Sequence, residues 1–176
     1  MFYIGTAGYS YQDWVGNVYP AGTKKEEMLA LYAREFPFSE INSTYYHMPG
    51  RKMIEAIISK TPSGFRFAVK AFQQMTHTRE GGEELFSKFN SALSPLVHSD
   101  RLVCILAQFP YSFHNTRENR DYLRKFRELT PGLPVAVEFR NARWVCRETF
   151  ELLKEEGLAF VCVDEPDIRG LYNFCY

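Results

Sequence analysis

The chain has 176 residues, of which 45% are hydrophobic and 24% charged, and this composition excludes a disordered or fibrous protein. The 21 Lys and Arg residues balance 21 Asp and Glu residues, so no overall field directs the chain to nucleic acid or an anionic membrane. The length suits one domain with its own core, and we expect a single domain over residues 1–176.

The start of the chain, MFYIGTAGYSYQDW, lacks the basic residues and long apolar stretch of a signal peptide. No apolar run reaches the ~20 residues that span a bilayer. The four cysteines form no CxxC pair and no zinc pattern, which is typical of free thiols in a reducing compartment. We therefore expect a cytoplasmic protein.

Apolar, β-rich segments alternate along the chain with segments of helical periodicity. Strands are expected at residues 2–6, 38–42, 65–71, 101–109, 133–139 and 158–164. Helices are expected at residues 24–35, 51–60, 83–97, 116–129 and 147–156. Turn residues such as Pro131-Gly132 mark the joints. This alternation predicts a parallel sheet covered by helices.

The spacing of the segments distinguishes two architectures of this class. Successive strands begin about 31 residues apart, as they do in a (β/α)8 barrel of ~250 residues. A doubly wound nucleotide-binding fold needs a glycine-rich loop after its first strand, and GTAGYSYQD is not GxGxxG. We therefore expect a TIM-type (β/α) barrel that is incomplete, with about six of eight βα units.

Polar side chains recur at the carboxyl-terminal tips of five predicted strands. Because strand side chains alternate between faces, the residues of each tip can be assigned to one face. The tip residues are Asn42, Lys70, Gln108, Glu138 and Asp164, and Glu40 shares the face of Asn42. Active sites of (β/α)8 barrels lie at this end, so these residues predict the floor of a site. A purely structural ion-pair network of Glu138 with Lys70 or Arg140 is the open alternative.

Five segments, in order, resemble the motifs of the YecE-like family, known as domain of unknown function 72. They are IGTAGYSYQDWVGNVYP, FSEINSTYY, FRFAVKAFQQMTH, LAQFPYSF and VAVEFRNARW. The resemblance covers essentially the whole chain and implies a TIM-type barrel, but it supplies no reaction. It implies ligand contacts by Thr6, Tyr9, Trp14, Asn42, Tyr46, His77, Gln108, Arg140 and Trp144.

This chain departs from the family pattern in three places. Val15 replaces a frequent Arg, so the first loop lacks that positive charge, and Tyr111 replaces a usual Pro. Six units instead of eight also suggest a chain truncated at its C-terminus, where EPDIRG is followed by LYNFCY. We then expect open edges at the first and sixth strands, through which the chain self-associates.

The leading hypothesis is acid–base chemistry on a small polar, anionic or sugar-like metabolite. Its catalytic candidates are Glu138, Lys70, Glu40 and Asp164. In this hypothesis Lys70 and Arg140 stabilise charge, while Asn42 and Gln108 orient the ligand. Aromatic residues such as Tyr9, Trp14, Tyr46 and Trp144 suit stacking on a sugar or a nucleobase, although they are equally typical of packing.

No cofactor is required by the sequence. Oxygen ligands from Glu40, Glu138 and Asp164, helped by Asn42 or Gln108, suit Mg²⁺ or Mn²⁺, whereas no HxH or HExxH pattern indicates zinc. Two alternatives stay open beside the enzyme hypothesis. One is a nucleic-acid-binding barrel, against which the zero net charge counts. The other is an inactive truncated fragment.

Overall fold

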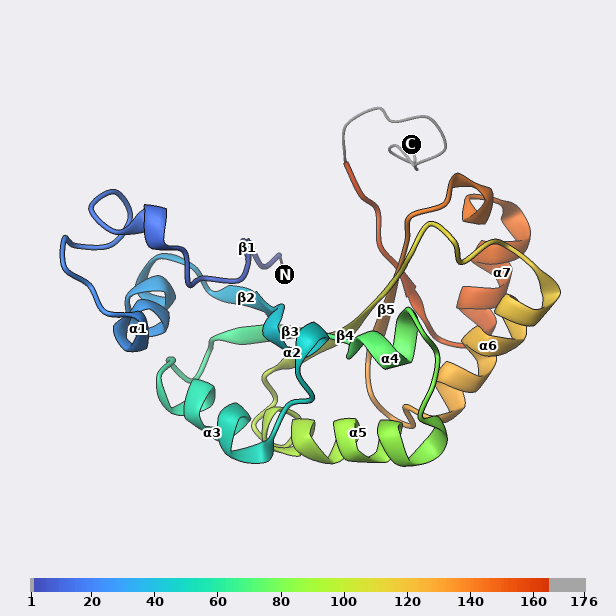
Figure 1. The fold of residues 1–176 in the computed structure, drawn as a ribbon, viewed down its shortest axis with the longest axis horizontal. Coiled ribbons are helices and arrows are strands. Elements are labelled where there is room, and N and C mark those ends of the chain that lie inside the picture. Colours follow the sequence, from blue (N-terminus) through green and yellow to red (C-terminus); the bar gives the residue numbers. More distant parts are fainter. Residues whose placement is uncertain (1, 165–176) are drawn as a thin grey trace. The chain divides into compact units, whose positions relative to one another are not determined.

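The computed structural model describes residues 2–164, which form two compact units (Figure 1). The first unit contains the chain up to Lys70 together with Phe89–Val103. The second contains Ala71–Lys88 and the chain from Cys104 onward. The segments EPDIRG and LYNFCY, with Cys175, lie outside the described residues, so the truncation inferred from them stays a prediction.

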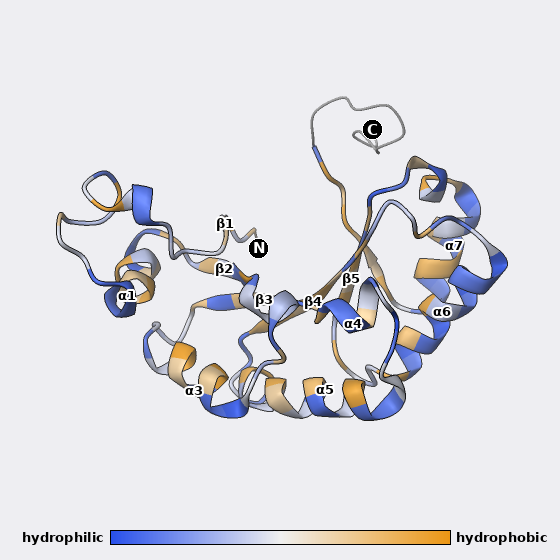
Figure 2. Cartoon of the chain, viewed as in Figure 1, coloured by the Kyte–Doolittle hydropathy of each residue, from blue (hydrophilic) through white to orange (hydrophobic). Residues whose placement is uncertain are grey.

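The first unit contains three parallel strands paired in chain order: β1 (Gly5–Ala7), β2 (Phe38–Ile41) and β3 (Arg66–Lys70). Its helices are η1 (Gln12–Trp14), α1 (Lys25–Glu35), α2 (Ser43–Tyr46) and α3 (Arg51–Ser59). Helix α1 buries Met28, Leu29 and Tyr32, and Figure 2 shows hydrophobic residues on this helix among hydrophilic ones. The Tyr32 hydroxyl accepts from the backbone N–H of Thr6 at 2.7 Å and donates to the carbonyl of Phe38 at 2.9 Å. One side chain thus fixes α1 to both β1 and β2.

The second unit contains parallel pairs of β4 with β5 and of β5 with β6. The bounds are Leu102–Phe109 for β4, Val135–Phe139 for β5 and Ala159–Phe160 for β6. The first two residues of β4 belong to the first unit. The helices of this unit are α4 (Gln73–Thr76), α6 (Arg117–Glu128), η2 (Ala142–Trp144) and α7 (Arg147–Glu155). A long helix, α5 (Gly82–His98), contributes residues to both units.

Aromatic rings form the core of the second unit. Phe109 stacks on Phe113 with centroids 4.1 Å apart, and Phe139 stacks on Trp144 at 4.4 Å. The indole N–H of Trp144 donates to the carbonyl of Phe113 at 2.6 Å, so the one polar atom of this ring system is satisfied inside the core. Helix α6 is mainly hydrophilic but places Leu123 and Phe126 in this core (Figure 2).

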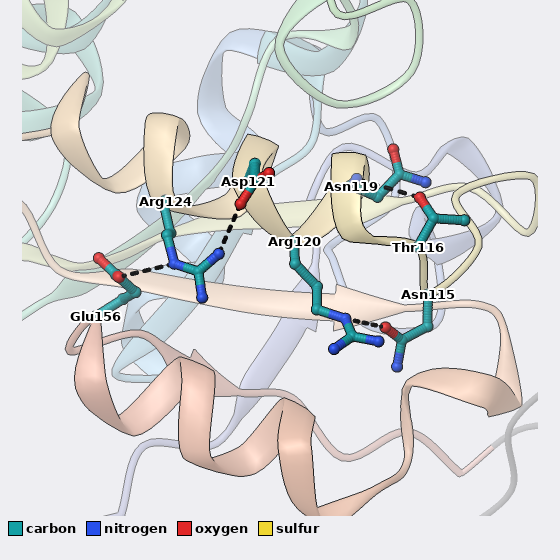
Figure 3. A network of polar contacts seen from close by, with 7 residues as sticks. All are labelled: Asn115, Thr116, Asn119, Arg120, Asp121, Arg124 and Glu156. Carbon is teal, nitrogen blue, oxygen red and sulfur yellow. Dashed lines mark hydrogen bonds and ion pairs between the residues drawn. The ribbon is translucent and has the colours of Figure 1, made fainter.

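Polar contacts join α6 to its surroundings in the second unit (Figure 3). The Arg124 guanidinium lies 2.7 Å from Asp121 and 3.6 Å from Glu156, the C-cap residue that follows α7. At the other end of α6, Thr116 caps the helix by accepting from Asn119, and Arg120 donates to Asn115 at 2.7 Å. Asn115 in turn donates to the carbonyl of Arg143 at 3.0 Å. These contacts hold the loop after β5 against α6.

All six predicted strands and all five predicted helices overlap an observed element, so the α/β class with parallel strands is confirmed. The first strand begins later than predicted, at Gly5, because Phe2 and Ile4 are 98% and 73% exposed. The sixth ends earlier, at Phe160. The short helices α2 and α4 were not predicted. Strand pairing among residues 2–164 does not close a barrel, so the TIM-type architecture is not confirmed.

Within residues 2–164, no helix combines the length and apolar composition needed to cross a membrane.

Candidate functional site

The strand tips of the second unit bring together three predicted site residues, which we call the Glu138 cluster: Gln108, Glu138 and Arg140. Gln108 of β4 is the register partner of Glu138 of β5, so both side chains lie on the same face of the sheet, as the alternation predicts. The Gln108 amide donates to Oε1 of Glu138 at 2.8 Å. The Arg140 guanidinium lies 2.7 Å from the same oxygen.

Burial gives these contacts their strength. Glu138 is only 7% exposed, while the Arg140 side chain is 34% exposed. A charge-assisted hydrogen bond in such surroundings is shorter and stronger than a neutral one. Both contacts involve Oε1, so two donors hold this one oxygen of the carboxylate. The cluster therefore presents one oriented carboxylate beside a partly exposed cation.

His77 lies in the second unit at the end of α4, and it is half-buried. Its Nδ1 is 3.0 Å from the hydroxyl of Thr76, which is almost fully buried, so the orientation of the ring is restrained. The neighbouring Arg79 lies over the ring of Phe113 at 5.4 Å. The sequence predicted His77 after the third strand, and its position agrees with that prediction; its role stays a prediction.

In the first unit, the strand tips of β1 and β2 border a pocket of about 420 Å³. Three predicted residues line it: Tyr9, Glu40 and Asn42. Burial raises the pKa of Tyr9 above its ordinary value, so its hydroxyl keeps its proton at neutral pH. Ser43, to which the family resemblance also points, lines the pocket as well, together with Lys25 and Ser10, which were not predicted. Lys25 begins α1, 16 residues after Tyr9 and 15 residues before Glu40, and periodicity gives no signal for such a contact.

Lys70, the last residue of β3, is half-buried in the first unit. Its ammonium lies 5.3 Å from the centre of the Tyr45 ring, a cation–π geometry. Burial, and secondarily the neighbouring Tyr46, raises the pKa of Tyr45. The Lys70 carbonyl accepts from the buried Thr44 hydroxyl at 2.7 Å, which ties α2 to the end of β3. Lys70 therefore lies at a strand tip, as predicted.

The four remaining predicted ligand contacts lie in different surroundings, and their roles stay predictions. Trp144 is fully buried and stacks on Phe139. Thr6 lies opposite Ser39 in the register, and its hydroxyl contacts Tyr32 at 3.0 Å, on the side of α1. Trp14 is half-buried against Tyr11, with centroids 4.8 Å apart. Tyr46 is 65% exposed.

Asp164 does not join the predicted row of polar strand tips. Strand β6 ends at Phe160, and Asp164 is an exposed residue beyond it. The register also pairs Phe160 with Val137, next to Glu138, so Phe160 lies on the opposite face from the Glu138 side chain. The ring of Phe160 contacts Phe150 of α7 at 5.0 Å. The predicted alignment of Phe160, Cys162 and Asp164 with Glu138 is therefore wrong.

In the part of the chain that the structure describes, no three His, Cys, Asp or Glu side chains form a group that could hold a metal ion. Glu40 belongs to the first unit and Glu138 to the second, so the Mg²⁺ or Mn²⁺ ligand set that includes Asp164 stays a prediction.

Parallel strands alternating with helices, with polar groups at the strand tips, define an α/β protein. The chain belongs to the family described as Protein of unknown function DUF72, whose model matches residues 3–171. The family resemblance seen in the sequence is thereby confirmed.

Relatives in this family cover nearly all of the chain. UPF0759 protein YunF of Bacillus subtilis (strain 168) is 34% identical over an alignment 178 positions long, which covers 96% of this chain and 62% of YunF. A solved DUF72 family protein from Thermotoga maritima MSB8 is 38% identical with a TM-score of 0.88, over 98% of this chain and 68% of that one. A DUF72 family protein from Enterococcus faecalis V583 is 30% identical with a TM-score of 0.79, over 87% and 65%. The chain thus spans 62% to 68% of the length of these relatives.

Proposed function

We propose that the protein is a TIM-type barrel enzyme that acts by acid–base chemistry on a small polar or anionic metabolite, with Glu138 as the group that gives or takes the proton. The observation that carries this proposal is the geometry of Glu138. Its carboxylate is buried at the carboxyl end of β5, and one oxygen is held by both Gln108 and Arg140. Six parallel strands alternating with helices support the barrel assignment.

Each member of the Glu138 cluster has a distinct part in this proposal. Gln108 orients the carboxylate, since its amide donor is fixed by the register of β4 and β5. Arg140 is partly exposed, so its guanidinium can pair with an anionic group of the ligand as well as with Glu138. The second oxygen of Glu138 then meets the transferred proton within hydrogen-bond reach.

A structural ion pair would use the same residues but would behave differently. A buried pair contributes little net stability compared with a neutral replacement of the same shape, because desolvation offsets the attraction. A catalytic carboxylate, by contrast, cannot be replaced by an amide without loss of proton transfer. Glu138→Gln keeps the shape and one acceptor oxygen, so it separates the two interpretations.

A thermal-shift screen of the purified chain against sugar phosphates, sugar acids and neutral sugars tests the proposal. At least one compound is expected to raise the unfolding temperature, because a ligand that binds only the folded state stabilises it by mass action. Glu155→Gln is the matched control, since Glu155 is an exposed residue of α7 in the same unit. The proposal fails if no compound stabilises the wild type.

Nucleic-acid binding stays the alternative, and salt separates it from the metabolite proposal. Affinity for single- and double-stranded DNA measured at two salt concentrations would fall steeply with salt if Lys and Arg contacted phosphates. A steep fall, together with an empty metabolite screen, would favour the alternative.

A further inference from the structure

The pocket between the tips of β1 and β2 has the volume of a small-molecule site. At about 420 Å³ it falls in the range of ~300–1,000 Å³ typical of ligand pockets. All of its lining residues belong to the first unit, and the inference drawn from it does not depend on the chemistry proposed for Glu138. Its lining chemistry indicates which class of ligand fits.

The loop that forms one wall of the pocket is held in place by three hydrogen bonds. The Gly8 N–H donates to the carbonyl of Glu40 at 3.0 Å, the Tyr19 hydroxyl donates to the carbonyl of Tyr9 at 2.6 Å, and the Tyr11 hydroxyl donates to the carbonyl of Ala7. Gly8 has a φ of +89°, a conformation that other residues rarely adopt. The wall is therefore formed before a ligand arrives, which lowers the ordering cost of binding.

Asn42 presents an amide to this pocket. It precedes α2 at the N-cap position, where Asn commonly accepts from the helix backbone, yet its side chain does not cap α2. Instead the half-buried side chain lines the pocket. An amide offers two donors and one acceptor oxygen, which matches the vicinal hydroxyls of a polyol.

The charges that line the pocket cancel. Lys25 supplies one positive group and Glu40 one negative group. A phosphate or carboxylate placed here would meet the like charge of Glu40, with Lys25 as the single cation among the lining residues. An uncharged ligand meets no such cost.

The remaining lining groups are hydroxyls that both donate and accept, on Ser10, Ser43 and Tyr9. The Tyr9 ring packs near Tyr32 at 6.2 Å and gives the pocket one restrained aromatic surface. We propose that this pocket binds an uncharged polyhydroxylated molecule of monosaccharide size, held by Asn42, Glu40 and Lys25 beside the Tyr9 ring. An apolar ligand would cover these polar groups without making hydrogen bonds to them.

Titration of the ¹⁵N-labelled chain with D-glucose, D-galactose, D-ribose and myo-inositol tests this proposal by two-dimensional NMR. At least one probe is expected to shift the amide signals of Gly8 and Asn42. Asn42→Ala should weaken that binding about tenfold or more, through loss of the amide contacts. Asn17→Ala is the matched control, because Asn17 is exposed, lies outside the pocket and bonds only locally, to the Asp13 carbonyl at 3.1 Å.

A second pair of variants guards against misfolding of the first. Lys25→Met should weaken probe binding about tenfold, whereas Lys52→Met, at an exposed position of α3, should leave it unchanged. The proposal is overturned if none of the four probes shifts the Gly8 and Asn42 signals, if Asn42→Ala binds as the wild type does, or if gluconate or glucose 6-phosphate shifts these two signals at a lower concentration than the neutral sugars do.

Discussion

The two units use polar strand tips in different ways. In the first unit, Glu40 and Asn42 line an open pocket together with Lys25. In the second, Glu138 is buried and bonded to its own neighbours, Gln108 and Arg140. Polar groups that face a pocket contribute to binding and little to stability, whereas a buried and paired group affects both. The same sequence pattern, a polar residue at the end of a strand, therefore has two physical meanings.

The two tryptophans, Trp14 in the first unit and Trp144 in the second, also differ in burial. Replacing them gives the largest expected difference in the free energy of unfolding. Trp144 of the second unit is fully buried, so Trp144→Ala should lower the free energy of unfolding by about 3–5 kcal/mol. Trp14 of the first unit is half-buried, and Trp14→Ala should cost clearly less. Urea unfolding curves measure both. Equal costs would show that the two aromatic groups do not differ.

The Glu138 cluster gives the next largest effect. Glu138→Ala removes the carboxylate that faces Arg140, and we expect a loss of about 2–3 kcal/mol, below the full cost for a buried pair because Arg140 is 34% exposed. Glu155→Ala, at an exposed position of α7, should change stability by less than about 0.5 kcal/mol. Chemical denaturation of both variants checks this. A loss no larger than that of Glu155→Ala would contradict the burial argument.

Tyr122 provides a pH-dependent test within the second unit. Its hydroxyl donates to the carbonyl of Met75 at 2.7 Å, and burial raises the pKa of Tyr122 to about 12, with Arg79 opposing the shift. Its contribution to stability is complete below pH 10, the ordinary pKa, and is lost as pH rises from 10 toward about 12. Tyr122→Phe should cost about 1 kcal/mol at pH 7 and flatten the alkaline decline. Thermal unfolding between pH 8 and pH 11.5 measures it, and an unchanged slope would show that Tyr122 ionises normally.

The smallest expected effect is in the pocket of the first unit. Asn42→Ala should change the free energy of unfolding by less than about 0.5 kcal/mol, because Asn42 has helical backbone angles that Ala adopts easily and does not cap α2. The same variant is expected to lose sugar binding. A large loss of stability would mean that Asn42 is a structural residue, and the contrast between the two units would not hold.

Local sequence patterns were sufficient to predict the strands and one cluster of the site. The alternation of apolar and polar residues predicted that Gln108 and Glu138 share a face, and the register of β4 and β5 confirms it. The sixth strand was harder, because only Ala159 and Phe160 pair with β5, and the polar end of that segment, Asp164, lies beyond the pairing.

Contacts between distant residues could not be predicted in this way. Trp144 follows a strand as a rim residue would, but its burial depends on Phe113, with which it shares a stacking contact at 5.2 Å. Lys25 reaches the pocket only because Tyr32 anchors α1 to β1 and β2. Such positions follow from tertiary packing, and no periodicity in the sequence reports them.

A comparison of reaction rates tests the role of Glu138 most directly. The wild type and Glu138→Gln are each given the compound that stabilises the wild type most, and the rates of conversion are compared. Product formation followed by NMR should be at least about 100-fold slower in Glu138→Gln, the usual contribution of a general acid or base, while affinity for the compound changes far less. Glu155→Gln should match the wild type. Equal rates in Glu138→Gln and the wild type would show that the carboxylate of Glu138 is only a structural partner of Arg140.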